Sequence, residues 1–189
     1  MSKEIKLNLG CYNKKIHGFI NIDVRSDTNP DLVENCLTLP SFKENSISLI
    51  YASHFFEHLD FQQGIQAIKR YFDLLIPSGI LRLAVPDMEA TFAHYFYWKD
   101  LNILYSALWG SQRHEFDRHL SGYDEKTLTE LFLNTGFSTV EKWKWQDVEH
   151  GFCDDYSQAY YPYQQKYGLI KGEETQIGKA MSLNLEGKK

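Results

Sequence analysis

The sequence has little of what marks a disulfide-rich, membrane-spanning or nucleic-acid-binding protein. Its three cysteines, Cys11, Cys36 and Cys153, form neither an even disulfide framework nor the close spacing of a metal site. No hydrophobic run approaches the length of a membrane span, and we see no signal-peptide pattern. A formal net charge of −5 does not supply the basic face that nucleic-acid binders usually carry. We therefore expect a reduced, cytoplasmic protein with no membrane span and no nucleic-acid partner.

The sequence does contain enough hydrophobic material for one folded domain. Of its 189 residues, 43% are hydrophobic and 15% are aromatic, which indicates a globular chain with a proper core. Strand-like and helical patterns alternate, so we expect residues 1–189 to form one α/β domain whose mainly parallel sheet is covered on both faces. Strand patterns occupy residues 5–9, 19–23, 46–51, 79–85, 139–143 and 181–185, and helical patterns occupy residues 61–75, 87–109 and 124–135.

Small and polar residues follow the predicted strands. In open α/β sheets, ligands bind beyond the carboxyl ends of the strands, so these residues are candidates for a binding site. Gly10 lets the backbone approach a ligand, Asp23 could hold a ribose diol by two hydrogen bonds, and Asn35 could read an adenine edge. A single acid at a strand end more often caps or turns the chain. The ordered set, rather than any one member, indicates a nucleoside site.

Several segments of the sequence form a recognisable set of motifs: LNLGC (7–11), GFINID (18–23), LP (39–40), SHFFEHL (53–59), PSGILRLAVPD (77–87), TGF (135–137) and SLNLE (182–186), with Gly110, Gln112 and His119. Together they resemble the motifs of small class I methyltransferases that use S-adenosylmethionine, in particular those of short bacterial proteins that are tied by inference to surface-polysaccharide biosynthesis. The resemblance implies a Rossmann-like three-layer fold with a seven-stranded sheet whose last strand is antiparallel, S-adenosylmethionine as donor and S-adenosylhomocysteine as product. The implied cofactor-binding residues are Gly10, Cys11, Tyr12, Asp23, Asn35, Cys36 and His54.

Two departures from this family pattern limit the resemblance. Tyr12 stands where family members usually carry a second glycine, and its side chain either crowds or lines the donor pocket. Asp23 follows Gly10 by only 13 residues, so the first helix must be shortened to a single turn or be absent. The loss of that helix argues against NAD(P), whose pyrophosphate needs a helix N-terminus.

The segment 113–119 (RHEFDRH) has the densest supply of groups that could act as a general base. A hydroxyl acceptor would benefit from a base that removes its proton during methyl transfer. We expect His119 to be this base, oriented by Asp117 or by another acid. The alternative is a solvated charged loop, or a histidine that ties the loop to the sheet.

His54, Glu57 and His58 form a pattern that needs a separate interpretation. Ubiquinone-pathway O-methyltransferases resemble this segment, with a Glu-x-x-Glu-His set that holds a divalent ion; here His54 replaces the first carboxylate. We expect Glu57 and His58 instead to cap the following helix or to bond the loop, and we expect no metal requirement.

The stretch 146–175 is expected to be an insertion that shapes the acceptor site. Its tyrosines and acids suit a sugar or a protein interface equally well. The aromatic and acidic residues of this stretch are Phe152, Asp154, Asp155, Tyr156, Tyr160, Tyr161, Tyr163 and Tyr167.

We expect methyl transfer to a hydroxyl of a sugar or other small molecule. The alternatives are a protein or nitrogen acceptor, or a catalytically silent Rossmann-type domain kept for binding or homodimer formation.

Overall fold

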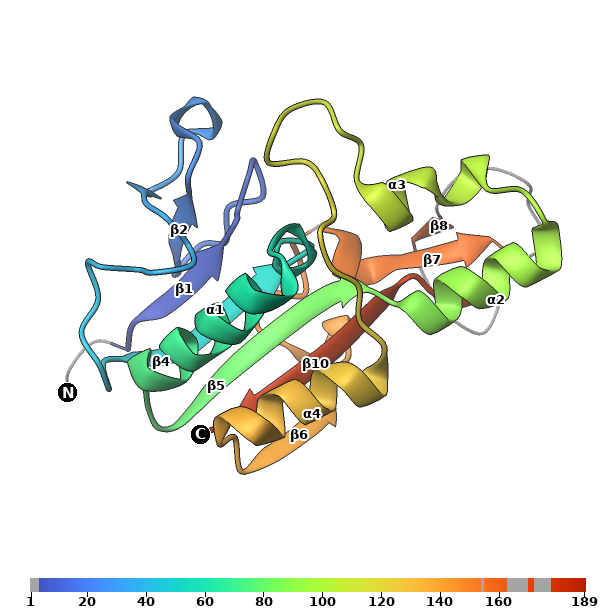
Figure 1. The fold of residues 1–189 in the computed structure, drawn as a ribbon. Helices are drawn as coiled ribbons and strands as arrows, with labels where there is room; N and C mark the ends of the chain where they lie inside the picture. The colour runs from blue at the N-terminus through green and yellow to red at the C-terminus, as the bar shows by residue number, and fades with distance from the viewer. Residues whose placement is uncertain (1–3, 154, 163–169, 172–177) are drawn as a thin grey trace.

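A seven-stranded, mainly parallel sheet organises the protein (Figure 1). The computed structural model describes residues 4–153, 155–162, 170–171 and 178–189. The strand order is β3-β2-β1-β4-β5-β10-β6, and β10 lies antiparallel between β5 and β6. The predicted fold class, with its antiparallel last strand, is confirmed. The strands are β1 (Lys6–Leu9), β2 (Ile20–Asp23), β3 (Leu32–Val33), β4 (Ile47–Ser53), β5 (Leu75–Pro86), β6 (Thr139–Lys142) and β10 (Ser182–Lys188).

Helices α1 (Phe61–Leu74) and α4 (Glu125–Thr135) contact each other and cover one face of the sheet (Figure 1). Each begins with an aspartate whose carboxylate accepts a hydrogen bond from the third helical N–H: Asp60 for α1 and Asp124 for α4. Helix α4 ends at Gly136, whose φ of 118° lies in the left-handed region that favours glycine. The predicted helices 61–75 and 124–135 are therefore confirmed.

The helix predicted over 87–109 is interrupted. Helix α2 (Met88–Trp98) ends at Lys99, which has a φ of 53° and donates its N–H to the Tyr95 carbonyl. The carboxylate of Asp100 then accepts the N–H of Asn102, and the chain starts again as the 3₁₀ turn η3 (Asn102–Leu104) and helix α3 (Tyr105–Trp109). A left-handed lysine carries no sequence signal, so periodicity alone predicted one continuous helix.

No helix connects β1 to β2, as the short spacing predicted. A network of side chains holds this connection instead. The Asn8 amide donates to Asn21 Oδ1 at 2.9 Å, and the same oxygen accepts the Ile16 N–H at 2.7 Å. The Asn21 amide in turn donates to Asp31 Oδ2 at 2.6 Å. Buried amides therefore replace the helix in positioning the loop after β1.

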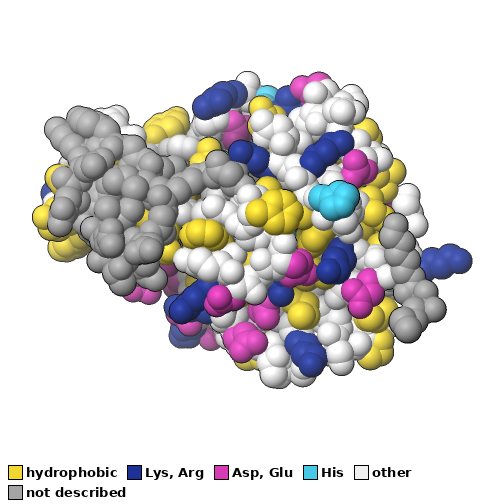
Figure 2. Space-filling model, turned by 180° about the vertical axis from the view of Figure 1, so that it is seen from behind, with side chains coloured by type: hydrophobic (Ala, Val, Ile, Leu, Met, Phe, Trp, Pro, Cys, Tyr) yellow, Lys and Arg dark blue, Asp and Glu magenta, His cyan; other side chains and the backbone are white. Residues whose placement is uncertain are grey.

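Alternating side chains on the strands separate two cores. The larger core packs under α1 and α4 and includes Leu9, Ile50 and Leu83. The opposite face carries Leu49 and Tyr51 and is covered by the loop 143–153, which includes the 3₁₀ turn η4 (Trp145–Asp147). Figure 2 views this side, where acidic and basic side chains are interspersed.

A second, three-stranded antiparallel sheet was not predicted. Its strands are β7 (Ala159–Pro162), β8 (Ile170–Lys171) and β9 (Gly178–Ala180), in the order β8-β7-β9. Ala159 and Tyr161 of β7 pack with Ala90 of α2, Leu104 of η3 and Met181 in a small core of their own. Among the described residues, no helix is long and apolar enough to cross a bilayer.

His150 should make the stability of the fold depend on pH. Its ring is 2% exposed, lies 3.9 Å from the Tyr51 ring between centroids, and faces the Arg82 guanidinium at 3.3 Å. Burial and then Arg82 lower the pKa of His150 from 6.5 to about 4. The unfolded chain therefore takes up a proton at a higher pH than the folded chain. The stability that neutral His150 contributes is full above pH 6.5 and is lost as the pH falls toward 4.

We expect His150→Gln to remove this pH dependence. Across that window the wild type should lose about 3 kcal/mol more unfolding free energy than the variant, because each pKa unit corresponds to about 1.4 kcal/mol. Urea unfolding at intervals across the window measures the difference. Parallel pH profiles for the two proteins would show that His150 is not the group responsible.

Candidate active site

A large cleft opens at the carboxyl edge of β1, β2, β4 and β5. Its volume is about 1340 Å³, which exceeds the roughly 300–1,000 Å³ of pockets for one small molecule and leaves room for a donor and an acceptor together. Every residue predicted to act in binding or catalysis lines this cleft. These residues are Gly10, Cys11, Tyr12, Asp23, Asn35, Cys36, His54, Asp117 and His119.

The loop after β1 is formed by two residues in the left-handed region. Gly10 has a φ of 60°, and a Cβ at this position would lie 2.6–2.7 Å from side-chain atoms of Phe55. Tyr12 has a φ of 43° and is 53% exposed at the cleft. Glycine adopts this backbone conformation without strain, whereas here a tyrosine adopts it at the expense of some strain.

Asp23 is buried at the end of β2 and is oriented by the main chain. Its Oδ2 accepts the Tyr12 N–H at 2.8 Å, and its Oδ1 accepts the Arg25 N–H at 2.9 Å. Each oxygen therefore keeps one lone pair for a further donor. Two adjacent hydroxyl groups of a ligand could donate to these two oxygens.

Asn35 and the two cysteines form the neighbouring wall. The Asn35 side-chain oxygen accepts the Leu37 N–H at 2.9 Å, which leaves the amide nitrogen as the group that can donate to a ligand. Burial raises the pKa of both Cys11 and Cys36 to about 12, so both thiols are protonated at neutral pH. They can line a pocket, but they are not activated nucleophiles.

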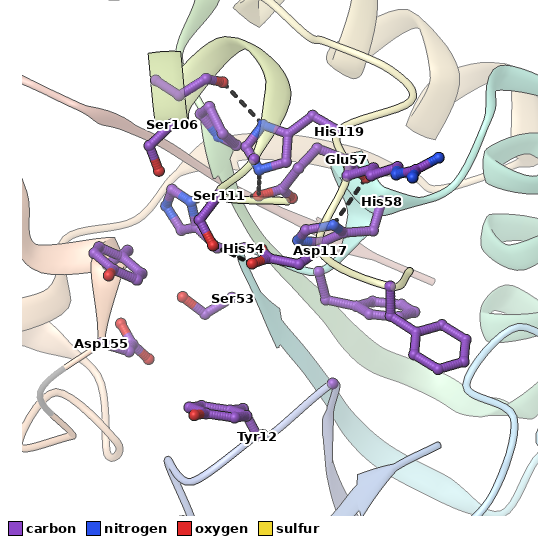
Figure 3. Close-up of a pocket in the computed structure, with 18 of the residues that line it drawn as sticks. Tyr12, Ser53, His54, Glu57, His58, Ser106, Ser111, Asp117, His119 and Asp155 are labelled. Atoms are coloured by element: carbon purple, nitrogen blue, oxygen red, sulfur yellow. Dashed lines mark hydrogen bonds and ion pairs between the residues drawn. The ribbon is translucent and has the colours of Figure 1, made fainter. Parts of the chain in front are cut away.

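Three imidazoles surround a buried carboxylate at the other end of the cleft (Figure 3). Glu57 lies in the 3₁₀ turn η2 (Phe56–His58), and its side chain is 1% exposed. Its Oε1 lies 3.4 Å from His54 Nδ1 and 3.8 Å from His119 Nε2. No described residue donates a well-formed hydrogen bond to either carboxylate oxygen.

The electrostatics of this cluster keep Glu57 ionised. Burial acts to raise the pKa of the Glu57 carboxyl, but the imidazoles of His54, His58 and His119 outweigh it, and the pKa lies below its usual value. Burial lowers the pKa of the His119 imidazole, which Glu57 opposes without reversing. The cluster therefore holds a buried negative charge beside a histidine that is hard to protonate.

The acid next to His119 is Glu57, not Asp117. The Asp117 carboxylate accepts hydrogen bonds from the Ser111 hydroxyl and the Arg113 N–H, both within its own loop. Of the two roles expected for Glu57, it does not cap the following helix, because Asp60 caps α1, but it does bond the loop, since its main-chain oxygen accepts the N–H groups of Leu120 and Ser121.

His58 does bond the loop, as the sequence indicated. Its Nδ1 lies 3.0 Å from the Arg118 carbonyl oxygen. His54, predicted to touch the donor, lines the cleft, but Glu57 faces its Nδ1, and its Nε2 lies 3.2 Å from Ser182 Oγ. Ser182 opens the SLNLE motif, but no sequence pattern placed it beside His54, because β10 comes from the far end of the chain.

The predicted insertion contributes a third wall. Tyr156 is exposed in the cleft, and Tyr161 is buried there, stacked on His94 with ring centroids 4.6 Å apart. Asp155 lies beside them and accepts the Tyr51 hydroxyl at 2.7 Å. Phe152 is 70% exposed and Tyr160 is buried, and neither lines the cleft. Asp154, Tyr163 and Tyr167 lie outside the described residues.

Gly10→Ala should destabilise the protein more than the same change at Gly18. Both glycines have a positive φ, 60° and 85°, but a Cβ at Gly18 would meet nothing within 4 Å. We expect about 1 kcal/mol for Gly18→Ala from backbone strain alone. Gly10→Ala should cost about 1–3 kcal/mol more, because the methyl group collides with Phe55. Chemical denaturation compares them, and Phe55→Ala in the Gly10→Ala background should recover part of the difference. Equal costs would show that the Phe55 contact does not matter.

Comparisons with known proteins support the architecture. No family model and no curated protein matches the sequence. Three solved S-adenosylmethionine-dependent methyltransferases have similar structures. The Archaeoglobus fulgidus protein has a TM-score of 0.61 at 12% identity, covering 100% of this chain and 87% of its own. The Methanosarcina mazei protein has a TM-score of 0.60 at 16% identity, covering 100% of this chain and 94% of its own. The Thermotoga maritima protein has a TM-score of 0.58 at 13% identity, covering 100% of this chain and 84% of its own. The chain therefore has the Rossmann-like fold that these methyltransferases share.

Proposed function

We propose that this protein transfers the methyl group of S-adenosylmethionine to a hydroxyl of a sugar or of another small molecule. The observation that carries the proposal is the gathering of Gly10, Asp23 and Asn35 along one side of a cleft that has room for two molecules. The shared fold and the motif resemblance support it, since each similar structure named above is described as a methyltransferase.

The donor side of the cleft suits a nucleoside that lacks phosphate. The two oxygens of Asp23 each keep a lone pair for the ribose hydroxyls, and the Asn35 amide can donate to a ring nitrogen of adenine. The β1–β2 connection has no helix N-terminus to bind a pyrophosphate. S-adenosylmethionine needs none, and the methionine moiety would lie along the backbone after Gly10.

The acceptor side is formed by the histidine cluster and the aromatic wall. A sulfonium donor is already activated, so transfer depends on positioning the acceptor and on removing its proton. We place the acceptor hydroxyl beside His119 Nε2, whose lone pair would take the proton, with Glu57 stabilising the imidazolium that forms and Asp117 holding the loop. Tyr156, with its ring exposed in the cleft, could stack on a sugar.

The motif resemblance supports a role in envelope-polysaccharide biosynthesis. The cysteine pattern is what supports a cytoplasmic location. The alternative of a silent binding or dimerisation domain is favoured by one observation, the exposed Tyr12 ring at the donor loop. A protein or nitrogen acceptor is the other alternative, and an acceptor screen distinguishes it.

Asp23→Ala should weaken donor binding. We expect S-adenosylmethionine to bind wild-type protein with a micromolar dissociation constant, about −8 kcal/mol. Losing the carboxylate should reduce this by about 1–3 kcal/mol, because the ribose hydroxyls lose their acceptors. Isothermal titration calorimetry measures both values. The control is Asp73→Ala, which removes an exposed carboxylate on α1 that does not line the cleft. Absence of donor binding to the wild type at millimolar concentration would favour the silent domain.

His119→Ala should lower kcat strongly and leave donor affinity near the wild-type value. The expected loss is about 10²–10⁴-fold, because the acceptor proton would have no route off the oxygen. A donor-consumption screen over nucleotide sugars, lipid-linked glycans and small phenols identifies the acceptor first, and His17→Ala serves as the control. Methylation of a peptide or tRNA in place of every sugar would contradict the acceptor. Full activity of His119→Ala would contradict only the role of His119.

A further inference from the structure

Glu57 is a buried carboxylate that lacks a hydrogen bond of good geometry. Both oxygens lie inside the protein and accept no well-formed hydrogen bond from the described residues, and the nearest imidazole nitrogen is His54 Nδ1, 3.4 Å from Oε1. Buried carboxylates are normally paired or hydrogen-bonded, because removing their charge from water is costly. The groups that face Glu57 are imidazoles. Their contact with the carboxylate is favourable only if a proton or a cation lies between each nitrogen and the carboxylate oxygen.

The hydrogen bonds of His58 and His119 determine which ring nitrogens carry a lone pair. His119 Nδ1 lies 2.9 Å from the Ala107 carbonyl oxygen, and His58 Nδ1 lies 3.0 Å from that of Arg118. A carbonyl oxygen only accepts, so each Nδ1 carries the proton. In the neutral rings each Nε2 is therefore a bare lone pair. His119 Nε2 then faces Glu57 Oε1 at 3.8 Å with no proton between two acceptors.

A cation bound between these acceptor atoms would remove their mutual repulsion. Glu57, His58 and His119 each offer one ligand atom, and the three atoms lie within 4.8 Å of one another. Bonds of about 2.0–2.2 Å at the angles of a tetrahedral or octahedral ion place ligand atoms about 3–3.5 Å apart. The 3.8 Å between His119 Nε2 and Glu57 Oε1 is close to that value, and ligand atoms that lie as far as 4.8 Å apart would have to move inward to bind one ion.

We propose that Glu57, His58 and His119 bind a divalent transition-metal ion, with zinc as its representative. Two imidazoles and one carboxylate suit zinc, iron or nickel better than magnesium, which prefers oxygen ligands. The outer contacts match those of metal-binding histidines, whose second nitrogen donates to a carbonyl group. His54 orients the carboxylate from its other side, through Nδ1 at 3.4 Å.

The three ligands line the cleft, so the ion would keep a coordination position open toward a bound molecule. Metal binding itself does not depend on the proposed methyl transfer. If both hold, the ion would lower the pKa of a coordinated acceptor hydroxyl enough for its proton to leave to solvent, and His119 would act as a ligand in place of a base.

The test is metal binding by untagged, full-length protein that has been stripped with EDTA and dialysed. Zn²⁺ titrated by calorimetry should bind once per chain with a dissociation constant of about 1 µM or lower. Co²⁺ should give visible absorption bands that report the coordination geometry, and Mg²⁺ at the same concentration should not bind.

Glu57→Gln and His58→Ala should each weaken Zn²⁺ binding more than about tenfold, because each removes a ligand. His17→Ala, which removes an exposed histidine far from the site in sequence, should leave binding unchanged. Circular dichroism checks folding, and His58→Ala keeps the test decisive if Glu57→Gln does not fold. Absence of Zn²⁺ and Co²⁺ binding by the wild type, or wild-type affinity in both variants, would overturn the proposal and leave a protonated histidine as the partner of Glu57.

Titrating S-adenosylmethionine into the same stripped protein separates the two proposals. Donor binding without metal binding would overturn the metal site alone. Metal binding without donor binding would leave the metal site standing and remove the methyltransferase proposal.

Discussion

The buried carboxylate of Glu57 joins the segments that form the cleft. Its main-chain oxygen accepts the N–H groups of Leu120 and Ser121, and its side chain lies beside His54 and His119. The end of β4, the turn η2 and the loop before α4 therefore meet at one residue. An ionised carboxylate at this depth costs several kcal/mol unless positive charge or protons lie beside it. The packing of three imidazoles around Glu57 follows from this cost.

Arg82 is a buried charge in the same protein that is paired with carboxylates. Its guanidinium, on the sheet face away from α1 and α4, donates to Glu186 at 2.5 Å and to Glu149 at 2.8 Å. The pairing with Arg82 holds the pKa of Glu149 at about 2 against the opposing effect of burial. Arg82 is satisfied within the fold, whereas Glu57 is not satisfied by the described residues. A buried carboxylate that lacks a well-formed hydrogen bond and lies in a cleft is typical of a site that a ligand completes.

The sequence predicts what depends on periodicity and strand ends, and it fails where distant segments meet. The alternation of Leu7 and Leu9 and the helical spacing in α1 follow from burial of one face, so both were predicted. The residues predicted to bind a ligand line one cleft because parallel strands share a carboxyl edge. The partner of His119 was sought in Asp117, two residues away, but lies 62 residues away in Glu57. Strand β3, with two residues, is too short to show a pattern.

The missing first helix and the well-ordered donor loop have one physical explanation. Asn8 and Asn21 fix the turn from within, so the loop after β1 does not need a helix to hold it. This turn lets the Tyr12 N–H reach Asp23, and that hydrogen bond orients the carboxylate before any ligand binds. A binding group oriented in advance loses less conformational entropy when its ligand arrives. The left-handed strain at Tyr12 is therefore the cost of a preorganised Asp23, which explains why a tyrosine is tolerated at this position.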